Sequence, residues 1–239
     1  MKELLANKHR KAQGKFLVEG PKMAAEALAS GYLVLSAVYT TDFAAKNTAL
    51  LAQLAKVGAQ LNEADEQVLL SLCDTKTPQG VICALAMRTQ TAPNGYAGNW
   101  IALEDVQDPG NVGSIIRTAD AMGFSGVLLS DACADAFSPK VLRASMGSVF
   151  HIPIIQSEIA QQIKIFRQSG FLIIASHLEG DPATPSNTNM LLLIGNESKG
   201  LSTELTMQAD CLWKIPMKGK AESLGAAAAA AIMLYELAK

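Results

Sequence analysis

Short apolar runs alternate with helical patterns over the second part of the chain. Six runs have the length of strands and are continuously apolar: 100–103, 127–129, 152–155, 171–175, 190–194 and 212–215. Strands that are buried on both faces of a parallel sheet show this pattern. Helical patterns separate most of them, over 112–122, 139–146, 158–169, 203–209 and 223–238. The alternation predicts a doubly wound α/β domain.

The first 87 residues alternate between helix and strand over a shorter length. Helical patterns cover 21–30, 42–57 and 65–73, and strand patterns cover 32–39 and 81–86. Residues 88–99 lack periodicity and are rich in Pro, Gly and Asn, which is typical of a linker. The chain is therefore predicted to hold a small α/β domain at 1–87, a linker at 88–99 and a larger α/β domain at 100–239.

Composition narrows the class of protein. Hydrophobic residues make up 49% of the 239 residues and charged residues 18%, which indicates a globular chain. No apolar run reaches the roughly 18 residues of a membrane span, and the start of the chain lacks a signal-peptide core, so we expect a cytoplasmic protein without a membrane partner. The four cysteines form no Cys-x-x-Cys pair, which favours free thiols and predicts no metal site.

Basic residues gather at the N-terminus although the whole chain has a net charge of −2. Residues 1–22 hold six cations and two carboxylates, which gives a local net charge of +4. Such a segment fits binding to RNA phosphates, but it equally fits the solvated face of a surface helix. Charge alone leaves both interpretations open.

Polar loops follow three of the predicted strands. In open α/β sheets, ligands bind beyond the carboxyl ends of the strands. The first loop leads into a helix and contains Asn111, with Arg117 further along the same helix in an otherwise apolar stretch. An arginine in that position needs a partner or a function. The second loop, 194–202, places Glu197 between two glycines, and the third, 215–225, contains Ser223.

Each loop also has a purely structural explanation. Asn111, Ser202 and Ser223 each stand where a helix N-cap is expected, and Asn and Ser are favoured at that position. A single glycine-containing loop is a weak signal for a ligand site. The three loops carry weight only when they are considered together.

Together the three loops resemble, in order and spacing, the three signature motifs of the SpoU (TrmH-type) family of RNA ribose 2′-O-methyltransferases. Residues 77–81, Thr-Pro-Gln-Gly-Val, are similar to a family element at the end of the small domain, and residues 138–147 to its middle segment. Residues 16–20 and the basic run before them resemble the family's RNA-binding N-terminal domain, which is similar to a ribosomal protein. A dinucleotide-binding fold fits less well, because no G-x-G-x-x-G motif follows an early strand.

The resemblance implies S-adenosylmethionine as cofactor, RNA as substrate, a deep trefoil knot in the second domain and a homodimer formed through that knotted domain. It places the methyl donor in the loops at 176–180, 195–200 and 215–223. The implied cofactor-binding residues are Ser176, Leu178, Gly195, Asn196, Gly200, Ile215, Met217 and Leu224. The implied catalytic residues are Asn111, Arg117, Glu197 and Ser223, and the candidate RNA-binding residues are Lys8, Arg10, Lys11, Lys15 and Arg143.

Arg117 is expected to act as a fixed positive charge. A guanidinium does not give up its proton in proteins, so it cannot serve as the base. It is suited to stabilising a developing alkoxide and to binding a neighbouring phosphate. Removal of the hydroxyl proton then falls to water, to a phosphate oxygen or to Glu197, and the sequence leaves these three open.

One departure from the family pattern bears on activity. Many members have Ser-Leu-Asn before the last helix, whereas this chain has Ser223, Leu224 and Gly225. A catalytically weak RNA-binding paralogue is therefore an alternative to an active enzyme. A methyltransferase for small molecules is a third possibility, which the basic N-terminal domain disfavours. By family analogy we expect ribosomal RNA rather than transfer RNA as substrate.

Overall fold

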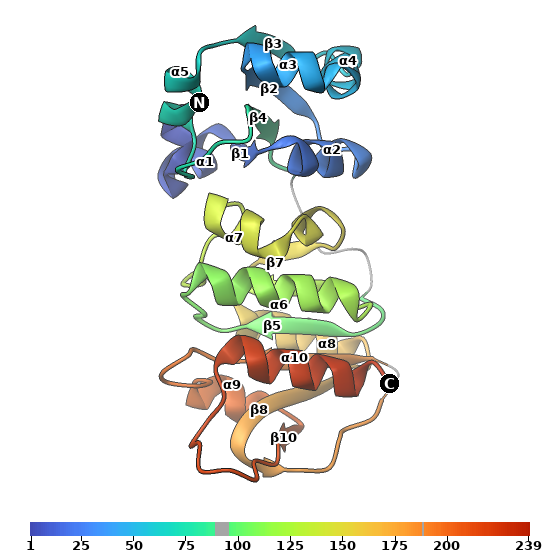
Figure 1. The fold of residues 1–239 in the computed structure, drawn as a ribbon. Helices are drawn as coiled ribbons and strands as arrows, with labels where there is room; N and C mark the ends of the chain where they lie inside the picture. Colours follow the sequence, from blue (N-terminus) through green and yellow to red (C-terminus); the bar gives the residue numbers. More distant parts are fainter. Residues whose placement is uncertain (89–95, 188) are drawn as a thin grey trace. The chain divides into compact units, whose positions relative to one another are not determined.

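The structure, a computed structural model, describes residues 1–88, 96–187 and 189–239. The chain forms two compact units, of which the first consists of Met1–Thr89 and Phe137–Phe150 and the second of Gln90–Ala136 and His151–Lys239. The first unit is therefore discontinuous in sequence. Most of the predicted linker, residues 89–95, lies outside the described residues (Figure 1).

The first unit contains a mixed four-stranded sheet with the order β1-β4-β2-β3. Strand β4 is antiparallel to both β1 and β2, and β2 is parallel to β3. The strands are β1 (Lys15–Glu19), β2 (Val34–Tyr39), β3 (Gln60–Glu63) and β4 (Val81–Ala86). The helices are η1 (Lys2–Leu5), α1 (Asn7–Gln13), α2 (Pro21–Ala29), α3 (Thr41–Lys46), α4 (Thr48–Lys56), α5 (Glu66–Leu72), α7 (Pro139–Ser145) and η2 (Ser148–Phe150).

One predicted helix of this unit was wrong in detail, and two strands of its sheet were not predicted. The helix predicted over 42–57 is divided into α3 and α4 at Asn47, whose φ of −132° lies outside the helical range and whose side-chain amide donates to the carbonyl of Phe43 at 3.1 Å. Strands β1 and β3 were not predicted. The polar sequence of β3 gives no apolar signal, because it forms the edge of the sheet.

Residues 137–150 join the first unit through an aromatic cluster. The ring of Phe16 in β1 lies 4.7 Å from the ring of Phe137 and 6.3 Å from that of Phe150, with Tyr32 on a further side at 6.0 Å. Rings at these separations stabilise each other beyond the area they bury. The segment therefore covers an aromatic side chain of the N-terminal sheet.

The second unit contains a six-stranded sheet in which every pairing is parallel, with the order β10-β8-β9-β5-β6-β7. This confirms the predicted parallel α/β fold. The strands are β5 (Trp100–Leu103), β6 (Gly126–Leu129), β7 (Ile154–Gln156), β8 (Leu172–Asp181), β9 (Met190–Ile194) and β10 (Cys211–Trp213). The helices are α6 (Pro109–Ala121), α8 (Ile159–Gln168), α9 (Thr203–Gln208) and α10 (Ala226–Leu237).

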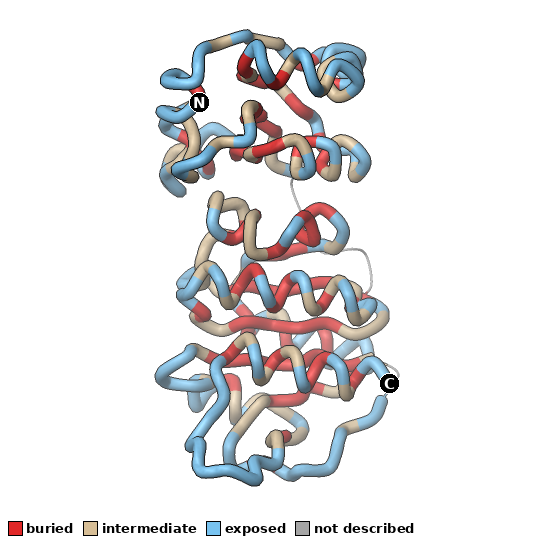
Figure 2. Tube along the Cα trace, in the orientation of Figure 1, coloured by how far each residue is buried: buried red, intermediate tan, exposed pale blue. Residues whose placement is uncertain are grey.

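The helices of this unit cover both faces of the sheet. Helices α6 and α10 pack against each other on one face, and α8 and α9 lie on the other (Figure 1). Every residue of the central strands β5 and β9 is buried, which explains their continuously apolar sequences (Figure 2). The last helix begins at Ala226, so Ser223 lies outside it, although the pattern predicted a start at 223.

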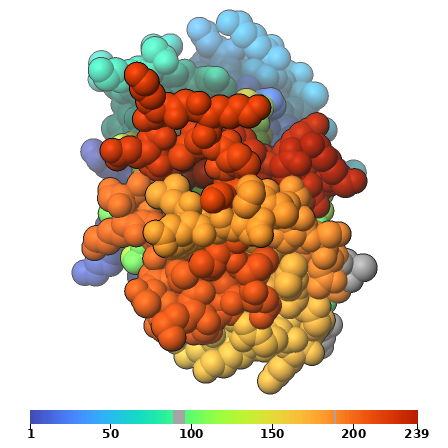
Figure 3. Space-filling model, turned by 90° about the horizontal axis from the view of Figure 1, so that it is seen from below, coloured from blue at the N-terminus to red at the C-terminus, as the bar shows by residue number. Residues whose placement is uncertain are grey.

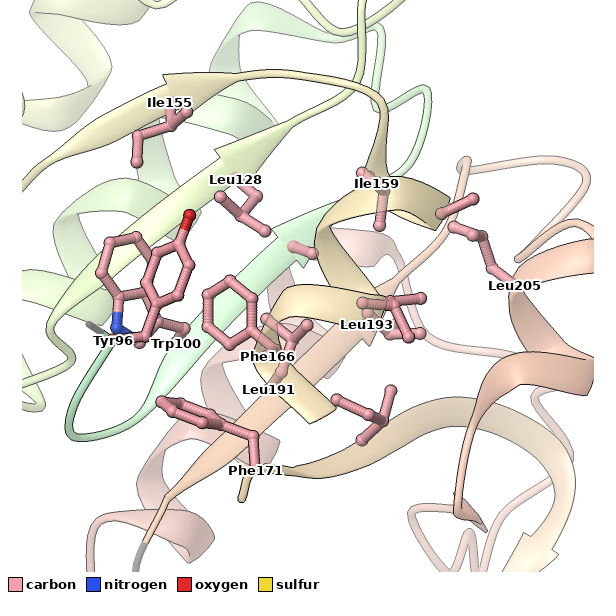
Figure 4. Packing of buried hydrophobic residues seen from close by; sticks show 14 residues of the cluster. Tyr96, Trp100, Leu128, Ile155, Ile159, Phe166, Phe171, Leu191, Leu193 and Leu205 are labelled. Carbon is pink, nitrogen blue, oxygen red and sulfur yellow. The ribbon is translucent and has the colours of Figure 1, made fainter. Parts of the chain in front are cut away.

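An aromatic cluster fills the space beneath α8. Phe166 of α8 stacks on Tyr96 with 3.9 Å between ring centroids, and Trp100 and Phe171 meet it edge to face at 5.6 and 4.7 Å (Figure 4). Burying such rings contributes about 2 to 3 kcal/mol each. This cluster holds α8 on the sheet and so fixes the strands whose ends carry the polar loops.

Candidate active site

A cavity of about 460 Å³ opens at the carboxyl ends of the strands of the second unit. Its walls come from the far half of β8, from the loop after β9 and from the segment between β10 and α10. Figure 3 shows a face of the molecule on which chain segments coloured orange to red gather. The volume lies within the range of small-molecule sites, which is roughly 300 to 1,000 Å³.

The eight residues implied as cofactor-binding all line this cavity. Glu197 and Ser223 line it as well. Ile194, Ala226, Ala229 and Met233 add an apolar wall, whereas His177, Glu179 and Lys214 add polar groups. The eight are Ser176, Leu178, Gly195, Asn196, Gly200, Ile215, Met217 and Leu224.

The loop after β9 closes tightly on itself. The backbones of Asn196 and Gly200 exchange two hydrogen bonds, of 3.0 and 2.9 Å. A Cβ on Gly195 would overlap the backbone of Gly200 and Leu201, so only glycine fits at this position. Within this closed loop, the side chain of Glu197 meets the first loop at Asp108 and Asn111.

Glu197 ties the second loop to the first. Its Oε1 accepts from the side-chain amide of Asn111 at 3.0 Å and from the backbone N–H of Asp108 at 3.2 Å. Its Oε2 accepts from the backbone N–H of Gln107 at 3.3 Å. A carboxylate only accepts hydrogen bonds, so Asn111 must present its NH2 group to Glu197 and leave its Oδ1 free for another donor.

These bonds determine the acidity of Glu197. Burial alone would raise the pKa of this carboxyl group, but the hydrogen bonds from Asn111 and from the backbone N–H groups outweigh it and hold the pKa below its ordinary value. A carboxylate with a lowered pKa is a weaker base. The geometry therefore favours Glu197 as a positioning group over Glu197 as the proton acceptor.

Two of the three proposed N-caps are not caps. Asp108 caps α6 by accepting from the backbone N–H of Asn111 at 2.8 Å. Gly225 occupies the N-cap position of α10, two residues after Ser223. Ser202 does cap α9, through a 3.2 Å bond from the backbone N–H of Leu205. The capping explanation therefore does not account for Asn111 or Ser223.

Sequence reasoning missed two residues that support the site. Asp105 follows β5 with a φ of 55°, in the left-handed region. Its carbonyl oxygen accepts from the side-chain amide of Asn196 at 2.8 Å, and its Oδ1 accepts from the hydroxyl of Ser130 at 2.6 Å. The loops after β5, β6 and β9 are thereby joined. The one sequence signal is an Asp two residues after a strand, since Asp tolerates positive φ.

Arg117 does not reach the cavity of its own chain. It is exposed on α6, and it is absent from the cavity lining. It makes no hydrogen bond or ion pair within the described ranges 1–88, 96–187 and 189–239. The structure thus brings Asn111, Glu197 and Ser223 to one region of the second unit and leaves Arg117 apart.

The candidate RNA-binding residues differ in exposure and in partners. Lys8, Lys11 and Lys15 are exposed in the first unit. Arg10 is only 3% exposed and donates to the carbonyls of Leu4 and Leu5 at 2.8 Å each, so it supports the fold, and we withdraw it from the candidate RNA surface. Arg143 forms a 2.6 Å ion pair with Asp74.

Two kinds of feature are absent from the described residues. No helix in this part of the chain is both long and apolar enough to cross a bilayer. Likewise, no group of three or more His, Cys, Asp or Glu side chains within it is arranged to hold a metal ion.

Known proteins resemble this chain over almost its whole length. Residues 98–235 match the SpoU rRNA Methylase family, and residues 1–83 match the MRM3-like substrate binding domain. The 23S rRNA (guanosine(2553)-2′-O)-methyltransferase RlmP of Bacillus subtilis is 33% identical over 239 residues, covering 99% of this chain and 93% of the relative.

Two solved structures carry the same fold. The AdoMet-bound rRNA methyltransferase from Sinorhizobium meliloti is 36% identical with a TM-score of 0.88, over 98% of this chain and 91% of that one. The SpoU methyltransferase AviRb from Streptomyces viridochromogenes, in complex with AdoMet, is 29% identical with a TM-score of 0.86, over 99% and 94%. Two of its three polar loops line one cavity and the first is hydrogen-bonded to them through Glu197, and the chain belongs to the SpoU rRNA methylase family.

Proposed function

We propose that this protein transfers the methyl group of S-adenosylmethionine to a ribose 2′-hydroxyl of a structured RNA in the cytoplasm, with ribosomal RNA as the substrate. One observation carries the proposal: Glu197 bonds Asn111 at the edge of a cavity that the eight implied cofactor residues line. The name of the Bacillus subtilis relative describes 2′-O-methylation of a guanosine in 23S ribosomal RNA. In this proposal, residues 1–87 bind RNA and residues 100–239 carry the reaction.

The cavity fits S-adenosylmethionine by its chemistry. The cofactor combines a flat base with a cationic sulfonium and an amino-acid end. Leu178, Ile215 and Met217 supply apolar surface for a base, and the carboxylates of Glu179 and Glu197 offset positive charge. When bound there, the cofactor supplies an electrophilic methyl group.

The protein's own residues then orient the hydroxyl. Glu197 holds the Asn111 amide, whose free Oδ1 accepts a hydrogen bond from the ribose hydroxyl. Ser223 supplies a second hydroxyl at the cavity wall. Since the pKa of Glu197 is lowered, the hydroxyl proton passes to water or to a phosphate oxygen of the RNA.

Arg117 enters the proposal through a second copy of the chain. Helix α10 lies beside α6 and exposes apolar side chains, with Ile232 at 41% and Tyr235 at 54% exposure. We propose a homodimer through these helices, in which Arg117 of one protomer completes the site of its partner. Its fixed charge there stabilises the developing alkoxide.

A trefoil knot in the second unit is part of the proposal. A Cβ on Gly180 would lie 2.6 Å from the backbone of Leu212 and Trp213. Gly180 lies in β8, which pairs in parallel with β10 and shifts register between Leu212 and Trp213, so this close approach belongs to the pairing of the two strands. The knot itself is proposed from the resemblance to the SpoU family.

The activity is tested by transfer of a labelled methyl group from S-adenosylmethionine to ribosomal RNA, followed by mapping of 2′-O-methylated positions. We expect one site to lose methylation in RNA from cells that lack the protein. Calorimetric titration with the cofactor separates the alternatives raised by Gly225, because a non-catalytic paralogue without donor affinity would show no binding heat. Absence of both transfer and binding would refute the proposal.

The dimeric site is tested by mixing two impaired variants, Arg117→Ala and Glu197→Gln, through co-expression. If Arg117 acts across the dimer, each mixed dimer contains one intact site and activity rises above that of either variant alone. If Arg117 acts within its own chain, neither site is intact and activity stays as low as in the separate variants. Arg117→Lys, with RNA affinity measured separately, shows whether the planar guanidinium is required.

A further inference from the structure

The first unit contains a second cavity that the proposed reaction does not use. Its volume is about 510 Å³, and it lies between the end of β2, helices α3 and α5, and the loop at 76–80. That loop contains the Thr-Pro-Gln-Gly sequence of residues 77–80, a motif to which the fold and the reaction give no chemical role. The cavity lies wholly within the first unit.

The walls of this cavity are fixed by the backbone. Gly80 has a φ of +79°, and a Cβ there would lie 2.8 Å from the Cβ of Phe43. The backbone N–H of Thr40 donates to the carbonyl of Gly80 at 3.0 Å, and that of Gly20 donates to the carbonyl of Val81 at 2.9 Å. The loop is therefore held against α3, and the cavity exists before any ligand arrives.

The lining divides into an apolar part and a charged rim. Phe43 and Leu69 are buried and line the cavity together with Pro78. Lys46 and Lys76 are exposed at its edge, and neither forms an ion pair with any described residue. The carboxylates of Asp42 and Glu66 also line it. The rim therefore carries both cations and carboxylates. A site for a simple anion would not explain the carboxylates.

A nucleotide matches this combination. A base that has left its stack buries its flat faces against apolar and aromatic side chains, and proteins read its edge by hydrogen bonds. Carboxylates accept from the amino groups of bases, whereas lysines pair with the phosphates on either side.

We propose that the cavity binds one unstacked nucleotide of the RNA substrate, with its base against the apolar surface of Leu70 and Pro78 and its phosphates at Lys46 and Lys76. The inference deepens the proposed function, because it assumes that the first unit binds the RNA to be methylated. The carboxylates of Asp42 and Glu66 favour a base with an exocyclic amino group over uracil.

The test uses the full chain and a 23S ribosomal RNA transcript as the probe. We expect the double variant Lys46→Ala, Lys76→Ala to raise the Kd by about tenfold or more and to lower the salt slope of binding by about 1.4, the value for two single-strand phosphate contacts. Lys56→Ala, an exposed lysine of α4 outside the cavity, is the matched control and should leave both quantities unchanged.

A second variant tests the cavity apart from its charge. Leu70 lines it and is 48% exposed, so Leu70→Trp fills the space without disturbing a buried side chain. We expect it to raise the Kd and to remove photo-crosslinks between the loop at 76–80 and the RNA. An unchanged Kd in both variants, with crosslinks mapping elsewhere, overturns the proposal.

Methyl transfer is measured on the same samples. A failure of the proposed enzymatic activity can then be distinguished from a failure of the proposed nucleotide site. If the wild type transfers no methyl group but the double lysine variant still binds RNA more weakly than Lys56→Ala, the nucleotide site stands and the enzymatic proposal falls. If the wild type methylates RNA and the cavity variants bind like the control, the nucleotide site alone is wrong.

Discussion

The two cavities of this protein are built in different ways. The cavity in the second unit is held by side chains, since Glu197, Asn196 and Asp105 join loops from three strands through hydrogen bonds. The cavity in the first unit is held by backbone contacts around Gly80. Polar substitutions should therefore alter ligand binding in the cavity of the second unit without unfolding that unit. Ligand binding in the cavity of the first unit should instead be sensitive to side chains that add volume.

The largest effect is expected at Gly195, because a close backbone contact there closes the loop that carries the side chains of Asn196 and Glu197. Gly195→Ala forces a Cβ into the backbone of Gly200 and Leu201, which should lower the free energy of unfolding by about 3 kcal/mol and abolish cofactor binding. Urea denaturation and calorimetry measure the two effects. Gly123→Ala, outside the implied donor loops and with nothing within 4 Å of its Cβ, is the control for cofactor binding. Normal stability of Gly195→Ala would show that the loop can open.

Gly80→Ala tests the backbone-built cavity. The positive φ and the contact with Phe43 should lower the free energy of unfolding by about 2 kcal/mol and weaken RNA binding. Affinity for S-adenosylmethionine should not change, because the cofactor cavity lies in the other unit. Gly14→Ala also has a positive φ but no neighbour within 4 Å, so it isolates the strain.

Glu197→Gln tests the side-chain-built cavity. The amide keeps the shape but loses the charge that strengthens four hydrogen bonds, so turnover should fall roughly 30-fold with a small change in stability. The folded pKa of Glu197 is lowered, so its stabilising effect is present above the ordinary pKa and is lost as pH falls through the folded value. Wild-type stability should drop there more steeply than that of the variant.

Ser130→Ala should have the smallest effect. It removes the 2.6 Å bond to Asp105, which positions the carbonyl that holds Asn196. If the free energy of cofactor binding becomes less favourable by about 1 kcal/mol, KM for the cofactor rises about fivefold, and kcat should change little. Ser114→Ala, an exposed serine of α6, should leave both constants unchanged. A fall in kcat alone would assign Ser130 to chemistry rather than to positioning.

The sequence predicted the architecture of the second unit because its central strands β5 and β9 are apolar throughout and glycines, Gly123 and Gly170, follow helices α6 and α8. It placed the eight cofactor residues by motif resemblance, and all of them line one cavity. It did not find Asp105 and Ser130, which are 25 residues apart and meet only through the register of β5 and β6. Hydrophobic periodicity along the chain cannot predict a hydrogen bond between the loops of two neighbouring strands.

Charge was a poor guide to exposure in the first unit. Arg10 counted toward a basic segment, yet its guanidinium is buried on the carbonyls of η1. The assignment of residues 137–150 to the first unit was likewise invisible, since it depends on the rings of Phe137 and Phe150 meeting Phe16. Both outcomes follow from tertiary contacts that local sequence does not encode.

Residues 137–150 belong to the first unit, but they are translated after the first strands and helix of the second unit. During synthesis, Phe16 emerges more than a hundred residues before Phe137 and Phe150, the rings that cover it. A ribosome that has delivered only residues 1–88 has released a sheet whose aromatic face is still uncovered. Nascent chains should therefore need a chaperone, or their own later residues, to stay free of aggregation until translation has passed residue 150.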